Sequence, residues 1–149
     1  MMRIVVLLLA VVLAACSTTS TIHQPHSGVT GQACGFTFRN QGGDDEEGIA
    51  QLERTIRDSL SSAGLLAVPG SEAGTIEVTL RHYYLRSNGA RFWAGVMAGR
   101  DKIISDVRVL DADGNVTGSF QVESTNTTAL GTSDGLREKH AQEIVDNLR

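Results

Sequence analysis

The chain has 149 residues and a formal net charge of −4, which is enough for one domain with a hydrophobic core and too short to suggest two. Hydrophobic residues make up 41% of the chain and only two prolines are present, which argues against disordered and fibrous classes. The acidic balance argues against general nucleic-acid binding, because that function needs a basic surface to displace counterions from phosphates.

The first 15 residues have the three regions of a secretory signal peptide. A cationic start at Arg3 is followed by an apolar run over residues 4–13 and then by two alanines. As a helix, residues 4–15 would be about 18 Å long, well short of the roughly 30 Å hydrocarbon core of a bilayer. We therefore expect residues 1–15 to be a cleaved signal peptide and not a permanent membrane span.

The segment Leu13-Ala14-Ala15-Cys16 resembles the lipobox of bacterial lipoprotein precursors. The resemblance implies that the Cys16 thiol receives a diacylglyceryl group, that the chain is cut before Cys16, and that the new amino terminus can be acylated. Two or more acyl chains hold a protein stably on a bilayer, whereas one binds only reversibly. Because Ser17 and not Asp follows Cys16, similarity to lipoproteins of two-membrane bacteria implies the periplasmic face of the outer membrane. The alternative is ordinary secretion, with Cys16 left as a plain thiol.

After Cys16, the chain is rich in Ser, Thr and Gly up to residue 32 and has no apolar periodicity. We expect residues 16–32 to be a lipidated cysteine with a flexible tether, followed by a single domain over residues 33–149. His23 and His26 lie three apart in this tether, but no Cys, Asp or Glu stands near enough in sequence to complete a metal site. We expect neither a metal site nor a cofactor.

The domain is expected to begin with a strand and a helix. Cys34 and the next two phenylalanines alternate with other residues, which predicts a strand that points Cys34 inward. Four acids at residues 44–47 precede apolar residues spaced three or four apart, and Gly64 ends the run. This pattern predicts an amphipathic helix, whose dipole explains the acids better than a cation site does. Residues 65–68 are expected to form a short edge strand.

Three further strands are expected, each with one buried face, over residues 75–85, 103–109 and 116–123. If a two-residue turn at Asp113-Gly114 joins the last two, Val107 faces Phe120 and the apolar side chains of both strands share one face. A three-residue turn without a bulge would place them on opposite faces. A turn also explains residues 111–115 better than a calcium loop, which needs further ligands.

A final helix is expected after Ser133 or Asp134, either of which can cap it. Its apolar residues approximate one stripe and are Leu136, Ala141, Ile144, Val145 and Leu148. The element order predicts an α+β fold, a two-layer sandwich with a mostly antiparallel sheet of four to five strands and two helices packed on one face.

The same order of elements, with Gly95 and Gly99 before a strand and a closing helix, looks like a group of small uncharacterised bacterial lipoprotein domains. The similarity spans about residues 74–149. It implies a location in the cell envelope and no known activity, and it supplies no catalytic residues.

Nucleophilic catalysis needs a Ser, Cys or Thr beside a base, and the sequence has no G-x-S-x-G motif. His82 has the parity of the apolar residues in its strand, which predicts a packed or edge histidine, and His140 is expected on a mostly solvated helix. Cys34, the remaining thiol, is expected to be buried, with an intermolecular bridge as the alternative. We therefore expect no enzymatic activity, although a Ser or Cys within hydrogen-bond reach of His82 or His140 would favour a hydrolase.

Two features are candidates for binding a partner. Phe92, Trp93 and Met97 lie in a nearly uncharged segment that would be a contact patch if exposed, and misplaced strand or core otherwise. The second feature is a run of basic residues with few acids between them, which would face an anionic surface or else form a solvated sheet face. These residues are Arg81, Arg86, Arg91, Arg100 and Lys102, with Arg108 beyond them.

Together these patterns favour a membrane-anchored envelope lipoprotein that acts as a non-enzymatic interaction or assembly module. Its expected partners are the membrane, through acyl chains on Cys16, and an unidentified envelope protein, with no nucleic acid. The alternatives are a periplasmic carrier of an apolar ligand, which would need an internal pocket, and the less favoured envelope hydrolase.

Overall fold

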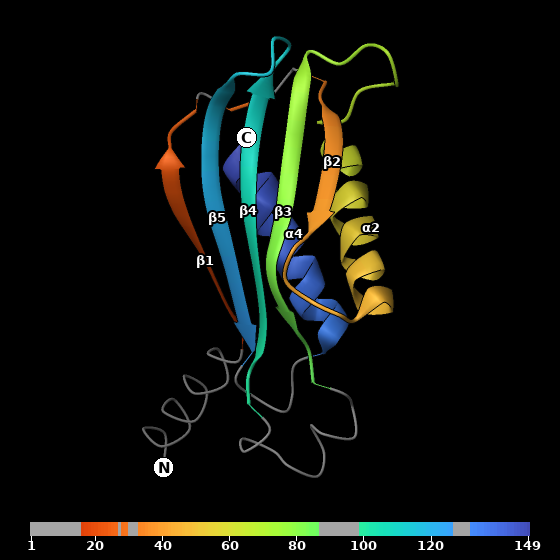
Figure 1. Cartoon of the computed structure of the whole chain (residues 1–149), viewed down its shortest axis with the longest axis vertical. Helices are drawn as coiled ribbons and strands as arrows, with labels where there is room; N and C mark the ends of the chain where they lie inside the picture. The colour runs from red at the N-terminus through yellow and green to blue at the C-terminus, as the bar shows by residue number, and fades with distance from the viewer. Residues whose placement is uncertain (1–15, 27, 30–32, 87–98, 127–131) are drawn as a thin grey trace, which may run out of the picture.

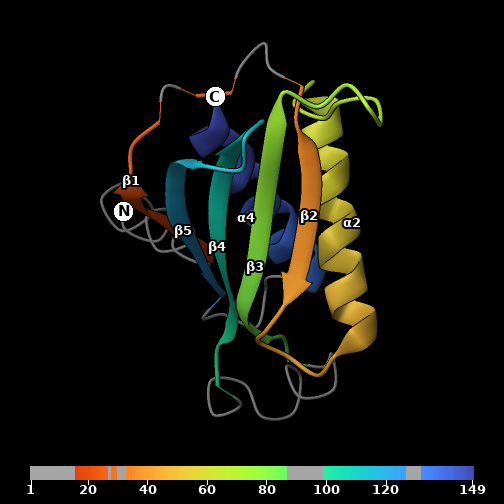
Figure 2. The ribbon, with the colours of Figure 1, turned by 45° about the horizontal axis from the view of Figure 1, so that its top comes forward.

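A computed structural model describes residues 16–26, 28–29, 33–86, 99–126 and 132–149. It contains a five-stranded sheet with the order β1-β5-β4-β3-β2 and two helices against one face (Figure 1 and Figure 2). The elements are β1 (Cys16–Gln24), β2 (Gly35–Asn40), α2 (Glu46–Ser62), β3 (Gly74–Tyr84), β4 (Asp101–Asp111), β5 (Val116–Asn126) and α4 (Ser133–Leu148). Among these strands β2 and β3 run parallel and the other neighbours run antiparallel, which confirms the predicted α+β sandwich.

Both helices bury the apolar side chains predicted for them. In α2, Leu52, Ile56 and Leu60 are fully buried between the helix and the sheet, and each such side chain contributes about 1.5–3 kcal/mol relative to exposure. The α4 stripe from Leu136 to Leu148 is buried in the same layer. In the described part of the chain, neither helix is long and apolar enough to cross a membrane.

The helix ends follow capping chemistry. The Asp45 carboxylate accepts a hydrogen bond of 3.0 Å from the Gly48 N–H, and Gly64 follows α2 with φ of 71°. At α4 the cap is Thr132, whose hydroxyl accepts from the Gly135 N–H at 3.0 Å. The prediction of Ser133 or Asp134 was therefore wrong by one or two residues, because the extended backbone that a cap requires lies at Thr132.

The flexible tether predicted for residues 16–32 is wrong over β1. This strand pairs along β5 from Cys16 to Gln24, at one edge of the sheet. Polar side chains add to this pairing: the Thr18 hydroxyl lies 3.2 Å from that of Ser124, and the Ser20 hydroxyl donates to Glu143 at 2.5 Å. Hydrophobic periodicity cannot reveal a strand that is held by its backbone ladder and by hydroxyl groups.

A bulge in β3 reverses the expected orientation of His82. The register with β4 shifts between Leu80 and His82, so that one residue, Arg81, is added to the strand. Tyr83 is consequently buried and His82 is exposed, which corrects the prediction that His82 shares the inward face.

The hairpin between β4 and β5 has the predicted register through a different turn. Val107 lies opposite Phe120 as expected, but the chain reverses through three residues, because the Asp111 N–H donates to the Asn115 carbonyl at 3.0 Å. The register then shifts by one residue around Thr117. This bulge cancels the effect of the longer turn and returns both apolar sets to one face.

Near the far edge, residues 65–68 form less structure than predicted. Leu66 makes a single isolated parallel bridge with Cys34, and β2 forms the edge of the sheet instead.

Hydrogen exchange can distinguish an edge strand from a tether. In the chain with Cys16→Ser, the amides of residues 17–22 that face β5 should exchange at least ~100-fold more slowly than a free peptide, because the ladder protects them. The exposed turn at residues 112–114 provides the fast-exchanging reference within the same molecule. Free-peptide rates throughout residues 17–22 would show that β1 does not form in solution.

Candidate functional site

The ends of four strands meet in one row at one end of the sheet. Cys16 pairs with Asn126, Asn126 pairs with Asp101, and Tyr84 pairs with Lys102 directly beside that row. Neighbouring strands lie about 4.8 Å apart, so β1 and β3 are separated at this end by about 14 Å. We call this part of the fold, defined by those five residues, the anchor end; it is the lower end of the sheet in Figure 1.

A buried ion pair holds the anchor end together. The side chains of Arg86 and Asp101 are both 0% exposed, with 3.1 Å between Arg86 Nε and Asp101 Oδ1. The backbone N–H of Arg86 also donates to Asp101 Oδ1 at 2.8 Å, and the Arg86 guanidinium donates to the Asn126 backbone carbonyl at 3.3 Å. One side chain thus links β3, β4 and β5. The prediction that Arg86 contacts an anionic surface is wrong in this conformation, since the residue is only 3% exposed.

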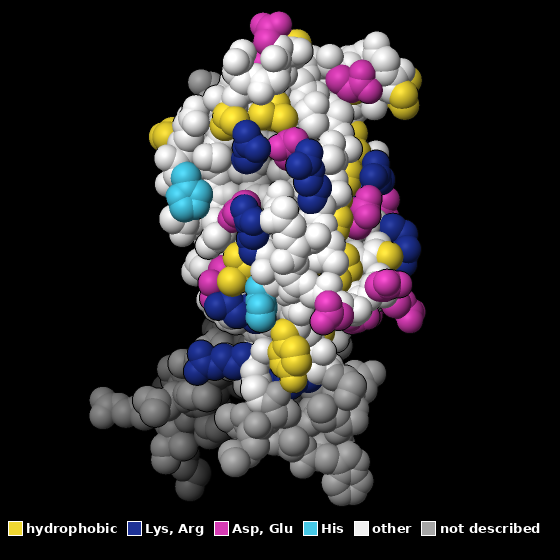
Figure 3. All heavy atoms as spheres, in the orientation of Figure 1, with side chains coloured by type: hydrophobic (Ala, Val, Ile, Leu, Met, Phe, Trp, Pro, Cys, Tyr) yellow, Lys and Arg dark blue, Asp and Glu magenta, His cyan; other side chains and the backbone are white. Residues whose placement is uncertain are grey.

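Acids on neighbouring strands break up the predicted basic run. The exposed face of the sheet carries alternating basic and acidic side chains (Figure 3). The ion pairs are Arg81 with Asp106 at 2.6 Å, Lys102 with Glu123 at 2.9 Å, and Arg108 with Glu77 at 3.3 Å. A count of acids between basic residues in the sequence could not reveal these partners, because antiparallel pairing supplies them from other strands.

The pKa of Asp106 reflects this surface network. Partial burial raises the pKa of its carboxyl, but hydrogen bonds from Gln121 and Arg81 outweigh burial and hold it below its usual value. Arg81 and Lys102 therefore lie on a solvated face of the sheet, which was the alternative expected for the basic run. Arg100 is exposed immediately before β4.

The apolar contact residues Phe92, Trp93 and Met97, together with Arg91, lie outside the described residues. The chain leaves β3 and enters β4 at the anchor end, so the segment that contains them begins and ends there.

A second buried polar cluster surrounds His140, against the expectation that this residue lies on a solvated part of its helix. His140 Nδ1 lies 2.9 Å from the Ser124 hydroxyl and Nε2 lies 2.9 Å from the Ser105 hydroxyl. All three residues are 0% exposed. Burial lowers the pKa of His140 to about 3, so the imidazole is neutral at ordinary pH and can donate to one serine while it accepts from the other.

Ser105 and Ser124 lie within hydrogen-bond distance of His140, as a hydrolase requires, but a substrate cannot reach them. A nucleophile must touch its substrate, and neither Ser105 nor Ser124 has any accessible surface. The arrangement instead satisfies hydroxyl and imidazole groups that would be costly to bury alone. It joins α4 to β4 and β5, and the contact between Ser124 and Thr18 extends it to β1.

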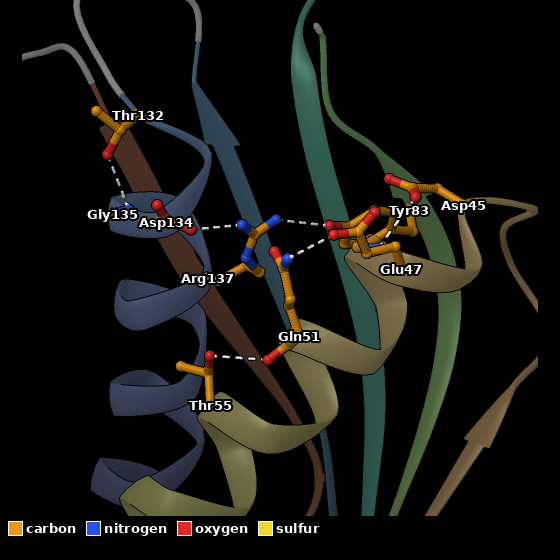
Figure 4. A network of polar contacts seen from close by, with 10 residues as sticks. Asp45, Glu47, Gln51, Thr55, Tyr83, Thr132, Asp134, Gly135 and Arg137 are labelled. Atoms are coloured by element: carbon orange, nitrogen blue, oxygen red, sulfur yellow. Dashed lines mark hydrogen bonds and ion pairs between the residues drawn. The ribbon is translucent and has the colours of Figure 1, made fainter.

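Arg137 and Tyr83 form a third polar group, between α4 and α2 (Figure 4). An Arg137 guanidinium nitrogen donates to the Tyr83 hydroxyl at 2.9 Å and another to Asp134 at 2.5 Å. Burial raises the pKa of Tyr83 and outweighs the opposing effect of Arg137, so the phenol remains protonated. Beside them lies an open cleft of about 550 Å³, lined largely by polar side chains that include Asp45, Glu47 and Arg137.

The remaining candidate groups are a second cleft, the Cys34 thiol and side chains of the metal-binding types. A cleft of about 520 Å³ between the two helices is also lined mainly by polar residues, including Asp58 and Glu138. Cys34 is buried as predicted, and burial raises the pKa of its thiol. Within the described ranges, no three side chains of the metal-binding types come together.

Comparisons with known proteins assign this sequence to a family. The model of a domain of unknown function, DUF4410, matches residues 40–131, from the end of β2 to the segment before α4. The chain belongs to the DUF4410 family. This agrees with the expected similarity to an uncharacterised domain, although the DUF4410 match begins earlier than residue 74. No curated protein of similar sequence was found.

Solved structures extend the fold comparison beyond the DUF4410 match. A PelC dodecamer from Paraburkholderia phytofirmans aligns with a TM-score of 0.58 and 11% identity, over 89% of this chain and 96% of the PelC chain. A second crystal form of PelC from the same organism gives a TM-score of 0.56 and 9% identity over the same shares. At these identities the likeness establishes the shared fold alone.

Removal of one partner from the buried ion pair should be far more damaging than removal from a surface pair. We expect Asp101→Asn to lower the free energy of unfolding by about 3–5 kcal/mol, because it leaves the Arg86 charge buried without its carboxylate. Asp106→Asn, which removes the partner of the half-exposed Arg81, should cost less than about 1 kcal/mol. Urea denaturation of both variants tests this difference, and equal losses would contradict it.

The His140 cluster should make the fold sensitive to mild acid. The pKa of His140 is lower in the folded chain than the usual histidine value of 6.5, so the stabilisation is complete above pH 6.5 and is lost as pH falls toward 3. From pH 7.5 to pH 5 we expect a loss of about 2 kcal/mol in unfolding free energy. His140→Gln, which can still donate and accept, should flatten this slope, whereas His82→Gln at an exposed position should retain it. An unchanged slope in His140→Gln would contradict the assignment.

Proposed function

We propose that this chain is a membrane-anchored lipoprotein of the cell envelope that acts as a non-enzymatic interaction or assembly module. The observation that carries the proposal is the segment Leu13-Ala14-Ala15-Cys16, which resembles a lipobox and stands directly after the signal-peptide pattern of residues 1–15. The resemblance makes Cys16 the first residue of the mature chain. Cys16 is also paired with Asn126 in the sheet, so an anchor at this residue would be attached directly to the described fold.

The exposed edge of the sheet supports an assembly role. β1 presents one side of its backbone to solvent, and its sequence CSTTSTIHQ contains neither proline nor a Lys, Arg, Asp or Glu residue. Edge strands usually carry such residues to prevent pairing with another chain, so β1 is open to addition of a strand from a partner. PelC, a chain of similar fold, is a dodecamer, and self-assembly is one form that this role can take.

The two other functions have weaker support. A carrier of an apolar ligand needs an enclosed apolar pocket, whereas the two clefts beside the helices are open and lined mainly by polar residues. A hydrolase is favoured by the contacts between His140 and its two serines and opposed by their complete burial.

The proposal predicts that membrane association depends on Cys16. In cells that process lipoproteins, Cys16→Ser should abolish lipidation and reduce flotation with membranes at least tenfold, since each buried methylene of an acyl chain contributes ~0.8 kcal/mol. Intact-mass measurement of the mature protein reads lipidation directly, and Cys34→Ser is the matched control, because that thiol is buried. Equal lipidation and flotation of Cys16→Ser and the parent chain would refute the anchor.

Partner capture tests the interaction role in the same membranes. Crosslinking from intact envelopes should recover a discrete partner or a multimer of the chain. Thr21→Lys on the exposed β1 should reduce capture if the edge is used, and Phe92→Ala with Trp93→Ala should reduce it if the apolar segment is used. If neither variant reduces capture, neither of these two surfaces binds the partner.

A further inference from the structure

The structure leaves no spacer between the proposed lipid anchor and the folded domain. Cys16 is itself part of the β1 ladder, paired with Asn126. The point below rests on the proposed function, because it requires acyl chains on Cys16. If they are present, their glycerol backbone lies within one side-chain length of the sheet, and the anchor end must lie at the level of the lipid headgroups.

The accessible side chains at this end have the chemistry of a membrane interface. Tyr84 is 47% exposed, one of three large hydrophobic residues that the described fold leaves open to solvent. Arg100 is exposed, and the Lys102 side chain is 36% exposed although it pairs with Glu123. Tyrosine favours headgroup depth because its ring is apolar and its hydroxyl is polar, and arginine and lysine favour anionic lipids.

Charge is distributed unevenly around this end. Arg100 and Lys102 lie where β4 begins, on the sheet side, whereas acids gather where the two helices begin. The acids include Glu46, Glu47 and Asp134, and the Asp134 side chain is 80% exposed. An anionic bilayer would attract the sheet side, next to Cys16, and repel the helix side.

We propose that the anchor end docks on an anionic bilayer through Tyr84, Arg100 and Lys102, with the exposed face of the sheet tilted toward the lipid and the helix N-termini tilted away. Each basic side chain near such a surface contributes only weakly to membrane binding. That contribution is sufficient to set orientation, because the acyl chains already hold the domain at the bilayer and the side chains act at high effective concentration.

Depth-dependent fluorescence quenching tests the docking on the lipidated full chain. In a Trp93→Phe background, Tyr84→Trp and Val68→Trp place single tryptophans at opposite ends of β3, which spans roughly 33 Å. Val68 is 75% exposed and lies in the loop before this strand. In vesicles of phosphatidylglycerol with brominated acyl chains, the emission of Tyr84→Trp should fall at least twofold relative to unbrominated vesicles, and that of Val68→Trp should not change.

Charge reversal tests the role of the basic side chains. Arg100→Glu should reduce the quenching of Tyr84→Trp at least twofold on phosphatidylglycerol vesicles and leave it unchanged on phosphatidylcholine. Arg108→Glu is the matched control, because it makes the same change near the far end of β4. Equal effects of the two reversals would overturn the assignment of Arg100.

Flotation of the same samples separates the two proposals. A lipidated chain that floats with vesicles while Tyr84→Trp remains unquenched would overturn docking and leave the anchor intact, as would crosslinking of position 84 to an envelope protein in place of lipid. A chain that neither carries lipid on Cys16 nor floats would overturn the proposed function, and the docking with it.

Discussion

The antiparallel pairing of β1 with β5 is the constraint on which the rest of the arrangement depends. It converts a polar N-terminal segment into the edge of the sheet and fixes Cys16 opposite Asn126. Because β4 and β3 extend to the same level, that pairing also brings Cys16 into one row with Asp101 and Tyr84. A covalent anchor at the first strand residue would then determine the position of the whole domain, whereas an anchor on a tether would leave its orientation free.

Polar groups are placed inside this fold where elements from distant parts of the chain meet. Arg86 joins three strand ends, and His140 joins a helix to two central strands. Such groups contribute little net stability when satisfied, but their loss is costly when one partner is left alone. They consequently favour a single register and a single helix placement over alternatives of similar hydrophobic content. The serine-histidine contacts are of this kind, since they connect elements in a region closed to substrate.

The predictability of each element follows from the kind of interaction that holds it. Sequence periodicity predicted α2, α4 and the central strands because their stability comes from buried apolar side chains such as Leu52, Ile56 and Phe120. It missed β1, where backbone hydrogen bonds and hydroxyl groups replace apolar contacts, and it misplaced His82, because a bulge leaves no mark in a pattern of alternate residues. The partners of Arg86 and His140 could not be predicted, since each depends on pairing across long stretches of chain. The lipidation of Cys16, which was inferred from a local sequence pattern, stays a prediction.

Because β1 pairs with β5, it can join the sheet only after most of the chain has been synthesised. Thr18 and its contact Ser124 are 106 residues apart, so most of the chain must be synthesised before β1 has a neighbour. Until then the stretch around Cys16 lacks the ladder that holds it, and a processing enzyme would meet an extended substrate there. Closure of the sheet by β1 would end that interval, so the proposed maturation at Cys16 would compete with completion of the fold for the same few residues of a nascent chain.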